Sequence, residues 1–497
     1  MYGLMTASLM KEIEKYTIET LGIPSIVLME KAAMAVCDEI RNTAADKSRI
    51  AVFSGVGNNG ADGIAIARIL RHEGYDTAVY IVGDEQKSTE EFRLQKRIFC
   101  NCGGMCRSFE GVEAVEADII VDALLGIGIS RDLEGDFLSA VRMINDLKNE
   151  NACKVVAVDI PSGINTDTGD VMGEAVRADI TVCLGEEKIG IRIGDSPDYA
   201  GRVVLADINT EGRIGPVAYV MEEADIKGLL PVRRAVSNKA TYGKLLVIAG
   251  SEEMPGASLL CARVAFKAGV GMVKLYTDTA ALQTVMAAMP EIMVSDYNEH
   301  DIREAFEWSD TAIIGPGLGR TDKAYAIVKT VIEEFKKPLI IDADGINIIK
   351  DNPKLLDKRK DRITVITPHP KEFAGLFQTS LADRLHKNPE YVKQKAGEMN
   401  MIIVAKDAST IITDGKDVYV NTTGTNALAT AGTGDVLSGL IAGLTAEGGN
   451  ALEACIAATY IHGRAGAAAA EKMSDYSVTA SDVIDKVINV MHNLTNK

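Results

Sequence analysis

The chain has 497 residues, and single hydrophobic cores rarely grow beyond about 250–300 residues, so we expect at least two domains. Hydrophobic residues make up 47% of the chain and charged residues 25%, which excludes a disordered protein and permits large cores. The formal net charge of -17 argues against nucleic acid or an acidic membrane as a partner, although local N–H groups and lysines can still bind a small anion.

No apolar run reaches the about 18–20 residues of a membrane-spanning helix, and the N-terminal segment carries charges where a signal peptide would be apolar. The eight cysteines are scattered, as is usual in a reducing compartment, so we expect a cytoplasmic protein. Cys100, Cys102 and Cys106 form the one cluster. We interpret them as ordinary thiols, because neither a nearby His nor a paired CxxC motif supplies the fourth ligand of a zinc site.

The first half alternates short apolar strands with helices, the pattern of a doubly wound parallel sheet. After a helical region at residues 8–37, we predict strands at 49–53, 77–82, 118–121, 154–159, 180–184 and 202–205. The predicted helices between them reach residue 70, lie near 90–100 and occupy 137–147. Ligands bind such sheets beyond the carboxyl ends of the strands.

Three of these strand ends carry polar residues. The first is SGVGNNGADG, in which glycines permit a tight turn before a helix and Asn58 and Asn59 add amide donors and acceptors. The second is DALLGIG from Asp122, and the third is DIPSG from Asp159. A left-handed turn alone would explain the first segment, but three polar ends at one sheet edge indicate a binding site.

The segments GNNGADG, VDALLGIG and VDIPSGI, with TGD following, resemble the NAD(P)H-hydrate epimerase domain. The resemblance implies a Rossmann-like three-layer domain, which we place at residues 1–215. It also implies a potassium ion held by the side chains of Asn59, Asp122 and Ser162. Oxygen ligands with a single carboxylate suit an alkali cation better than zinc. Ala61 replaces a glycine of the family motif, and we expect its methyl group to be tolerated if φ is negative.

The same resemblance implies which residues contact the hydrated coenzyme. They are Asn58, Asn59, Gly60, Ala61, Asp62, Gly126, Ile127, Gly128, Ile129, Ser130, Arg131, Asp132 and Asp159. We predict that Asp159 transfers the proton, because inverting C6 of a hydrated nicotinamide requires proton movement to open and reclose that centre.

A second α/β half follows a stretch without alternation at residues 212–224, and we place it at residues 225–497. Its predicted strands lie at 239–250, 271–276, 310–319, 338–345 and 362–373, with a strand pair at 401–413. Predicted helices lie at 256–268, 451–470 and 479–491. His369 lies between two prolines at a strand end, where a core histidine is unusual but a surface histidine is common. Lys406 ends an apolar strand, so we expect it to meet either an anion or a neighbouring carboxylate.

A glycine-rich segment at residues 421–439, NTTGTNALATAGTGDVLSG, runs into a predicted apolar helix. A helix start offers unpaired N–H groups, and glycines let that backbone approach a phosphate closely. Asp435 would repel a phosphate, so we interpret it as a general base beside a phosphoryl acceptor, with a simple N-cap as the alternative.

The segments YGKLLVIAGS, IGPGLG, IDADGIN, TPHPKE, KDAST and AGTGD resemble the ADP/ATP-dependent NAD(P)H-hydrate dehydratase, in the same order. The resemblance implies a ribokinase-like fold. It implies hydrate contacts from Ala257, Gly317, His369 and Asp435. It implies nucleotide contacts from Lys406, Asp407, Ala408, Ser409, Thr410, Thr425, Gly432, Thr433 and Gly434. Thr425, Ala427 and Ala431 depart from the usual Asn, Gly and Gly.

Nearly the whole chain therefore resembles the bifunctional NAD(P)H-hydrate repair enzymes. The resemblance implies that the first half interconverts the R and S hydrates, NADHX and NADPHX, and that the second half dehydrates the S form with ADP and Mg²⁺. Asp435 would take the C6 hydroxyl proton while backbone amides stabilise the transferring phosphoryl group. We expect a homo-oligomer. One alternative is a ribokinase-like kinase with a regulatory first half, but it would leave the NNG, VDA and PSG motifs unexplained. A second alternative is a non-enzymatic first half, which would not need these motifs either.

Overall fold

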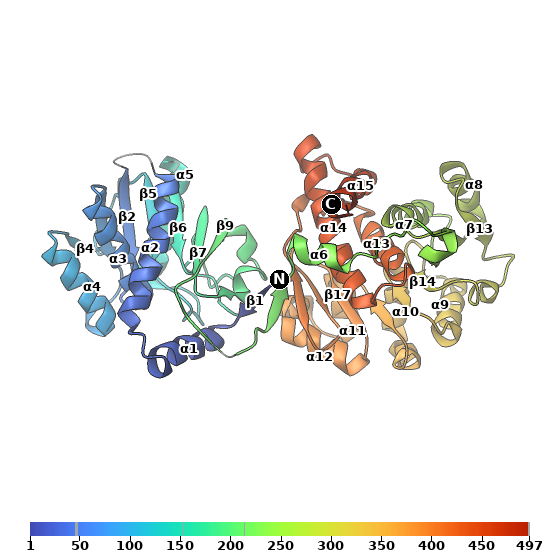
Figure 1. Ribbon diagram of the computed structural model, residues 1–497, viewed down its shortest axis with the longest axis horizontal. Coiled ribbons are helices and arrows are strands. Elements are labelled where there is room, and N and C mark those ends of the chain that lie inside the picture. Colours follow the sequence, from blue (N-terminus) through green and yellow to red (C-terminus); the bar gives the residue numbers. More distant parts are fainter. Residues whose placement is uncertain (45–47, 152, 213, 496–497) are drawn as a thin grey trace. The chain divides into compact units, whose positions relative to one another are not determined.

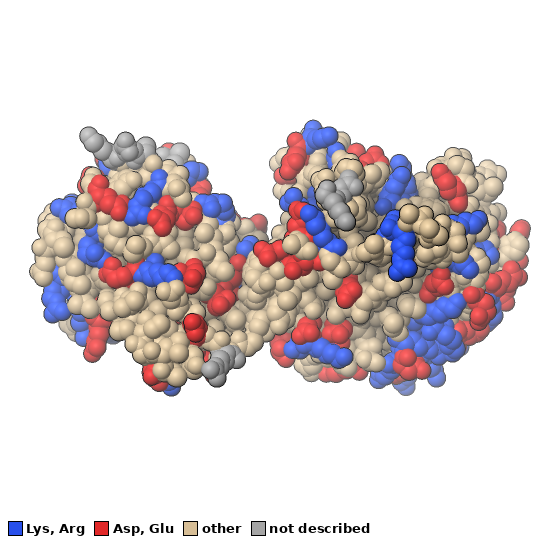
Figure 2. All heavy atoms as spheres, in the orientation of Figure 1, with Lys and Arg blue, Asp and Glu red and all other residues tan. Residues whose placement is uncertain are grey.

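The structure is a computed structural model of the chain and describes all residues except 45–47, 152, 213 and 496–497. It divides into two compact units. The N-terminal unit comprises Gly3–Val217, and the C-terminal unit comprises Ala218–Lys497 together with Met1–Tyr2. None of the described helices has both the length and the apolar composition that crossing a bilayer requires. On the face drawn in Figure 2, acidic and basic side chains are interspersed over both units.

The N-terminal unit is built on a parallel sheet with the strand order β4-β3-β2-β5-β6-β7-β9. Its strands are β2 (Arg49–Ser54), β3 (Asp76–Ile81), β4 (Cys106–Ser108), β5 (Ile119–Ala123), β6 (Lys154–Val158), β7 (Ile180–Leu184) and β9 (Arg202–Ala206). Its longer helices are α1 (Ala7–Lys15), α2 (Ser25–Thr43), α3 (Asn58–His72), α4 (Glu90–Asn101) and α5 (Gly135–Asn151). The strands consist largely of buried Val, Ile and Ala, as is typical of a parallel sheet covered on both faces.

Side chains of β2 alternate between two hydrophobic cores, because successive residues of a strand point to opposite faces. Ile50 and Val52 pack with α2, α3 and α4, whereas Ala51 and Phe53 pack with α5 (Figure 1). Helices on both faces of a parallel sheet make the three-layer, doubly wound arrangement that the strand–helix alternation predicted.

The N-terminal unit also contains two short strands outside this sheet, which, like β4, the sequence did not predict. β8 (Glu187–Lys188) follows β7, and it pairs in parallel with β1 (Tyr2–Met5). Leu4 lies opposite Glu187, and Met5 lies opposite Lys188. Because β8 has only two residues, its sequence shows no alternating strand pattern.

The C-terminal unit has a sheet in the order β13-β12-β11-β14-β15-β16-β17-β18-β19-β10. The strands are β10 (Ala218–Val220), β11 (Lys244–Ile248), β12 (Met272–Thr277), β13 (Met293–Asp296), β14 (Thr311–Ile314), β15 (Leu339–Ile341), β16 (Thr364–Ile366), β17 (Ile402–Ala405), β18 (Thr410–Thr413) and β19 (Val418–Asn421). They pair in parallel except at β17–β18 and β18–β19, which are antiparallel. The predicted strand pair at 401–413 is therefore a hairpin that extends the parallel sheet.

Helices cover both faces of this second sheet (Figure 1). One face packs against α7 (Pro255–Ala268), α13 (Thr433–Ala446), α14 (Ala451–Met473) and α15 (Ala480–Thr495). The other face carries α9 (Asp322–Glu334), α10 (Asp344–Asp351), α11 (Pro370–Phe377) and α12 (Pro389–Met399). The sequence predicted the helices of the first group and none of the second. It also left out α6 (Glu223–Leu229) and α8 (Thr279–Ala288).

Several strands of the C-terminal unit are shorter than predicted. Residues 239–250 begin with a 3₁₀ turn, Lys239–Tyr242, which Asn238 caps by accepting a hydrogen bond from the Ala240 N–H, at 2.9 Å. Gly243, with φ of +78°, then turns the chain into β11. The predicted strands at 338–345 and 362–373 run directly into α10 and α11, so their polar ends are helix starts rather than turns.

Candidate active sites

The first site lies in the N-terminal unit, where the strand order reverses between β2 and β5. Ligands of doubly wound sheets bind at such a switch point. The loop after β2 contacts the end of β5 closely, since a Cβ atom on Gly55 would lie 1.9 Å from the Leu124 carbonyl oxygen. A Cβ atom on Gly60 would lie 1.8 Å from the Gly55 carbonyl oxygen. Ala61 needs no glycine, because its φ is not positive and its methyl group is buried inside α3.

A cavity of about 320 Å³ opens at this switch point. Six of the predicted hydrate-binding residues line it: Asn58, Asn59, Asp62, Gly126, Ile127 and Asp159. Gly60 and Ala61 lie in the first turn of α3 and are buried without lining the cavity. Gly128, Ile129, Ser130, Arg131 and Asp132 do not line it either, and all of these except Ile129 are exposed. The structure therefore brings together about half of the predicted set.

The three predicted potassium ligands lie around one loop. Asp122 is fully buried, and it accepts hydrogen bonds from the Ser162 N–H at 2.8 Å and the Ser162 hydroxyl at 2.6 Å. The Leu125 N–H donates to the Ser162 hydroxyl oxygen at 2.9 Å, and a Cβ atom on the next residue, Gly126, would lie 3.5 Å from Asn59 Oδ1. Burial raises the pKa of Asp122 to about 6, although the hydrogen bonds from Ser162 oppose the rise.

Asp159 follows β6 and has a left-handed backbone conformation, with φ of +70°. Its Oδ1 atom accepts a hydrogen bond from the Leu184 N–H at 3.1 Å and forms an ion pair with the ammonium group of Lys188. Lys188 is 1% exposed and also donates to the Leu184 carbonyl at 2.7 Å. Sequence reasoning missed Lys188. No local pattern indicated it, because three residues separate it from the end of β7 and its own strand, β8, has only two residues.

Two further carboxyl groups, Glu14 and Asp62, line the same cavity. Burial raises the pKa of Asp62 well above its ordinary value, and the nearby charges of Asp159 and Glu14 add to the rise. Burial also raises the pKa of Glu14, with a further contribution from Asp159. Although burial acts to lower it, the pKa of Lys188 is raised because the Asp159 carboxylate stabilises the ammonium form. The site thus combines one fixed ion pair with two carboxyl groups that hold their protons more tightly than usual.

The second site lies in the C-terminal unit at the start of α13. Gly432 precedes this helix with φ of +88°, and a Cβ atom there would lie 2.6 Å from Leu260 Cδ1. The Thr433 hydroxyl fixes the preceding loop by donating to the Leu428 and Thr430 carbonyls, at 2.8 and 2.9 Å. The first N–H groups of an α-helix have no intrahelical partner and can bind an anion.

Asp435 lies in the first turn of α13, beside these amides. Its pKa is raised to about 7, chiefly by burial and then by the charge of Asp342, while Lys406 acts in the opposite direction. Lys406 Nζ lies 2.8 Å from Asp342 Oδ1, and a Cβ atom on Gly434 would lie 3.6 Å from the same Nζ. The carboxylate partner that the sequence left open for Lys406 is therefore present, and its ammonium group also faces the helix start.

His369 caps α11, and its side chain is 46% exposed, so it is not a core histidine. Nδ1 accepts a hydrogen bond from the Lys371 N–H at 3.1 Å, and Nε2 lies 3.4 Å from a Glu372 carboxylate oxygen. Burial, and then the charge of Lys406, lower the pKa of His369. Burial raises the pKa of Glu372 to about 7, against the effect of Lys406.

The other predicted contacts of this site also come together in pairs. Gly317 has φ of +60°, and a Cβ atom on it would lie 2.7 Å from Ala257 Cβ, so the loop after β14 touches the start of α7. A Cβ atom on Gly424 would lie 2.4 Å from the Ala408 carbonyl oxygen, which places the segment at 406–410 against the loop that leads to Thr425. These loops follow parallel strands and therefore share one edge of the sheet.

Comparison with known proteins identifies the family. One family model, described as NAD(P)H-hydrate dehydratase, matches residues 245–489, and another, described as YjeF-related protein N-terminus, matches residues 25–190. The bifunctional NAD(P)H-hydrate repair enzyme of Moorella thermoacetica is 31% identical over 520 residues, covering 99% of this chain and 97% of that protein. The chain belongs to the family of bifunctional NAD(P)H-hydrate repair enzymes.

The repair enzyme of Escherichia coli is 30% identical over 487 residues, covering 96% of this chain and 92% of that protein. A solved ribokinase-like superfamily protein from Enterococcus faecalis superposes with a TM-score of 0.52 at 26% identity, covering 58% of this chain and all of that one. Membership of the repair-enzyme family confirms the resemblance that the motifs indicated in both halves, and with it both predicted fold classes.

Sequence reasoning also missed the contact between His386 and Asp407. His386 is buried in a 3₁₀ turn, and its Nε2 lies 2.9 Å from an Asp407 carboxylate oxygen. Burial acts to raise the pKa of Asp407, but the hydrogen bond to His386 and other nearby groups lower it overall. His386 lies 21 residues from its partner, so no local pattern could have indicated the contact.

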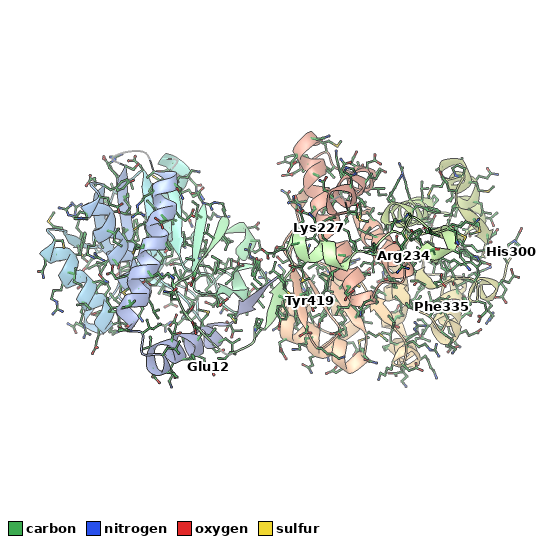
Figure 3. The ribbon with its side chains drawn as sticks, viewed as in Figure 1. Glu12, Lys227, Arg234, His300, Phe335 and Tyr419 are labelled. Atoms are coloured by element: carbon green, nitrogen blue, oxygen red, sulfur yellow. The ribbon has the colours of Figure 1, made fainter. Side chains whose placement is uncertain are left out.

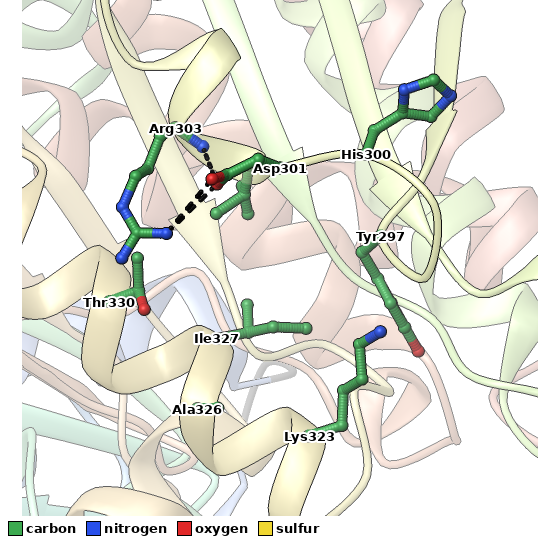
Figure 4. A pocket seen from close by; sticks show the side chains of 9 residues that line it. Tyr297, His300, Asp301, Arg303, Lys323, Ala326, Ile327 and Thr330 are labelled. Carbon is green, nitrogen blue, oxygen red and sulfur yellow. Dashed lines mark hydrogen bonds and ion pairs between the residues drawn. The ribbon is translucent and has the colours of Figure 1, made fainter.

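A further hollow of about 200 Å³ lies between α9 and the loop after β13 (Figure 4). In it Arg303 is 3.3 Å from the Asp301 carboxylate, and Lys323 Nζ lies 5.8 Å from the centre of the Tyr297 ring. None of the predicted site residues lines this hollow. Its ionic contacts satisfy one another, so we assign it no part in the repair chemistry.

Proposed function

We propose that this protein repairs damaged nicotinamide coenzymes in two steps. The N-terminal unit interconverts the R and S forms of NADHX and NADPHX, and the C-terminal unit dehydrates the S form at the expense of ADP, giving AMP and phosphate. The observation that carries this proposal is the placement of Asp435. A carboxyl group with a pKa of about 7 stands beside the first N–H groups of a helix, in a chain that belongs to the repair-enzyme family.

In the dehydratase step, Asp435 takes the proton of the C6 hydroxyl as the hydroxyl oxygen attacks the terminal phosphorus of ADP. The amides of residues 432–434 stabilise the charge on the transferring phosphoryl group. Because phosphate leaves far more readily than hydroxide, elimination then restores the dihydronicotinamide ring. Lys406 adds a positive charge next to this loop. Mg²⁺ bound to the nucleotide would neutralise part of the phosphate charge.

In the epimerase step, Asp159 accepts the proton of the C6 hydroxyl, which lets the ring open and reclose on either face. The donor set beside it fits an alkali cation. The buried carboxylate of Asp122 has no cationic side-chain partner among the described residues, and the Asn59 Oδ1 oxygen lies against the same loop at Gly126. A potassium ion held by Asn59, Asp122 and Ser162 would supply a fixed positive charge next to the substrate.

A coupled assay tests the two activities together. Full-length protein is incubated with the mixed R and S hydrates, with and without ADP, while the absorbance of NADH is followed. We expect complete conversion with ADP and no conversion without it. Conversion of only the S fraction would refute the epimerase, and a stable phosphorylated product without NADH would favour the small-molecule kinase instead.

Asparagine substitutions separate the two sites. Asp435→Asn should abolish dehydration and leave epimerisation intact, and Asp159→Asn should do the reverse. Asparagine is chosen for Asp159 because it tolerates the left-handed conformation that this residue adopts. The homo-oligomeric state and the cytoplasmic location expected from the sequence remain predictions, which light scattering and cell fractionation would check.

A further inference from the structure

The epimerase cavity contains one carboxyl group that neither the motifs nor the family resemblance assigned, that of Glu14. It lies on α1, a helix that Thr6 caps by accepting a hydrogen bond from the Leu9 N–H at 3.3 Å. Met10 and Ile13 are buried on the same helix and pack in one small core. This packing fixes the orientation of α1, and it places the next residue, Glu14, in the cavity wall.

Glu14 differs from Asp159 in its contacts. The carboxylate of Asp159 is held by Lys188 and the Leu184 N–H, both at Oδ1. No hydrogen bond or ion pair to Glu14 is present among the described residues. The carboxylate of Asp159 is therefore fixed in position by a buried cation, whereas the carboxyl group of Glu14 is not tied to another side chain.

We propose that Glu14 is a second catalytic residue of the epimerase, a proton donor that acts together with Asp159, and that Lys188 is a positioning residue that holds the Asp159 carboxylate in place. This inference rests on the proposed epimerase function. It follows from the need of a ring-opening reaction for one group that takes a proton and another that supplies one.

The step balances without any other reactant. Asp159 takes the proton of the C6 hydroxyl, the C6–O bond becomes a carbonyl, and the C6–N1 bond breaks. The electron pair of that bond goes to N1, which takes its proton from Glu14. After rotation of the aldehyde, N1 adds to the opposite face of the carbonyl, both protons return, and the other epimer results.

The electrostatics of the cavity support this division of roles. Burial, and then the negative charge of Asp159, raise the pKa of Glu14, which favours a protonated donor. The charged groups that line the cavity with Glu14 are Lys11 on its own helix, Asp62 on α3, Glu91 on α4, Asp159 after β6 and Lys188 on β8. Lys188 and Lys11 act in the opposite direction on the pKa of Glu14 and do not outweigh burial.

The test compares Glu14→Gln with Glu12→Gln in the full-length protein. Glu12 lies on the same helix in an exposed position (Figure 3). We expect Glu14→Gln to slow R-to-S conversion by about 100-fold or more and Glu12→Gln to leave it unchanged. In the wild type the rate should fall at high pH as the donor loses its proton, and Glu14→Gln should lack this fall. Circular dichroism checks folding, and dehydration of pure S hydrate in the same samples, carried out by the C-terminal unit, should not change.

Lys188→Gln tests the positioning role, because glutamine keeps a donor for the Leu184 carbonyl but removes the charge. The kcat of R-to-S conversion should fall by about tenfold or more with little change in KM, because the Asp159 carboxylate is no longer held in place. Lys15→Met, which changes an exposed lysine of α1, should leave both constants unchanged. A kcat of Lys188→Gln like that of the wild type overturns the positioning role. Circular dichroism checks folding.

A Glu14→Gln rate within threefold of the wild type, or loss of the high-pH fall in Asp62→Asn instead, overturns the donor role. Absence of R-to-S conversion in the wild type would refute the epimerase function itself, so the two failures are distinguishable.

Discussion

Lys406 Nζ lies 2.8 Å from Asp342 Oδ1, although the two residues follow strands, β17 and β15, that are separated by β16. Asp342 is only 1% exposed, so the pair is largely removed from water. The same two charges act in opposite directions on Asp435, whose pKa Asp342 raises and Lys406 lowers. This ion pair therefore links the ends of two strands, and its two charges influence the proton affinity of Asp435, the proposed general base.

Removing the cation of this pair should destabilise the C-terminal unit. Lys406→Met leaves the buried Asp342 carboxylate without a partner, and we expect the free energy of unfolding to fall by about 3–5 kcal/mol. Urea unfolding followed by the fluorescence of Trp308, the single tryptophan of the chain, reports on this unit alone. The double variant Lys406→Met/Asp342→Leu should recover most of the loss. An unchanged single variant would show that water already screens the pair.

Dehydration should depend on pH through Asp435. A general base must be deprotonated, and the pKa of this group is about 7, so the rate should rise by about tenfold per unit below pH 7 and level off above it. The profile of kcat/KM for pure S hydrate measures this dependence. Glu372 has a similar pKa and is the control, because Glu372→Gln should retain the acid limb. Loss of that limb in Glu372→Gln would reassign the base.

The same pKa predicts a cost in stability. The folded-state pKa of Asp435 lies above the ordinary value of 3.8, so the wild type is most stable below about pH 4 and loses stability as the pH rises towards 7. Asp435→Asn does not titrate. We therefore expect the inactive variant to be more stable than the wild type by roughly 1–3 kcal/mol at pH 8 and equally stable at pH 4. Trp308 fluorescence during urea unfolding measures the difference.

The variant Gly434→Ala tests, without disturbing the fold, whether the amides of residues 432–434 bind the phosphates of ADP. A Cβ atom there would meet nothing closer than Lys406 Nζ at 3.6 Å, and alanine is favoured over glycine inside a helix. Gly434→Ala should therefore fold at least as stably as the wild type and raise the KM for ADP by about tenfold or more. Gly432→Ala is the contrasting variant, since its φ of +88° and its contact with Leu260 predict lost stability as well. An unchanged KM in Gly434→Ala would place the nucleotide elsewhere.

Sequence patterns revealed those parts of the two sites that local chemistry determines. Gly432 and Asp435 at a helix start, and Asp122 and Asp159 at strand ends, are visible because the residue type and the strand–helix boundary occur together. Lys188 was not visible, because its strand has two residues and exists only through pairing with a segment more than 180 residues away.

The same limit applies to two other contacts. Glu14 enters the cavity only because the packing of α1 turns it there, and His386 meets Asp407 across two separate elements. The predicted strand at 239–250 begins five residues late for a local reason, since the cap at Asn238 stabilises a helical turn at Lys239–Tyr242 before β11 starts.

Potassium should stabilise the N-terminal unit through Asp122. Burial raises the pKa of this carboxyl from 3.8 to about 6, so without a cation the unit is most stable below about pH 4 and loses stability as the pH rises towards 6. A bound cation opposes that loss, and it adds stability that grows with its concentration. At pH 8 we expect potassium, but not lithium, to slow hydrogen exchange of the β5 and β6 amides and to accelerate epimerisation.

Asp122→Asn should remove both effects of potassium, because it takes the single carboxylate from the proposed ligand set. The amide also removes the buried charge, so the variant without potassium should exchange its β5 and β6 amides more slowly than the wild type at pH 8, and no differently at pH 4. Dehydration of pure S hydrate, carried out by the other unit, should be the same in both proteins. Equal responses to potassium in the wild type and in Asp122→Asn would exclude this carboxylate as a ligand.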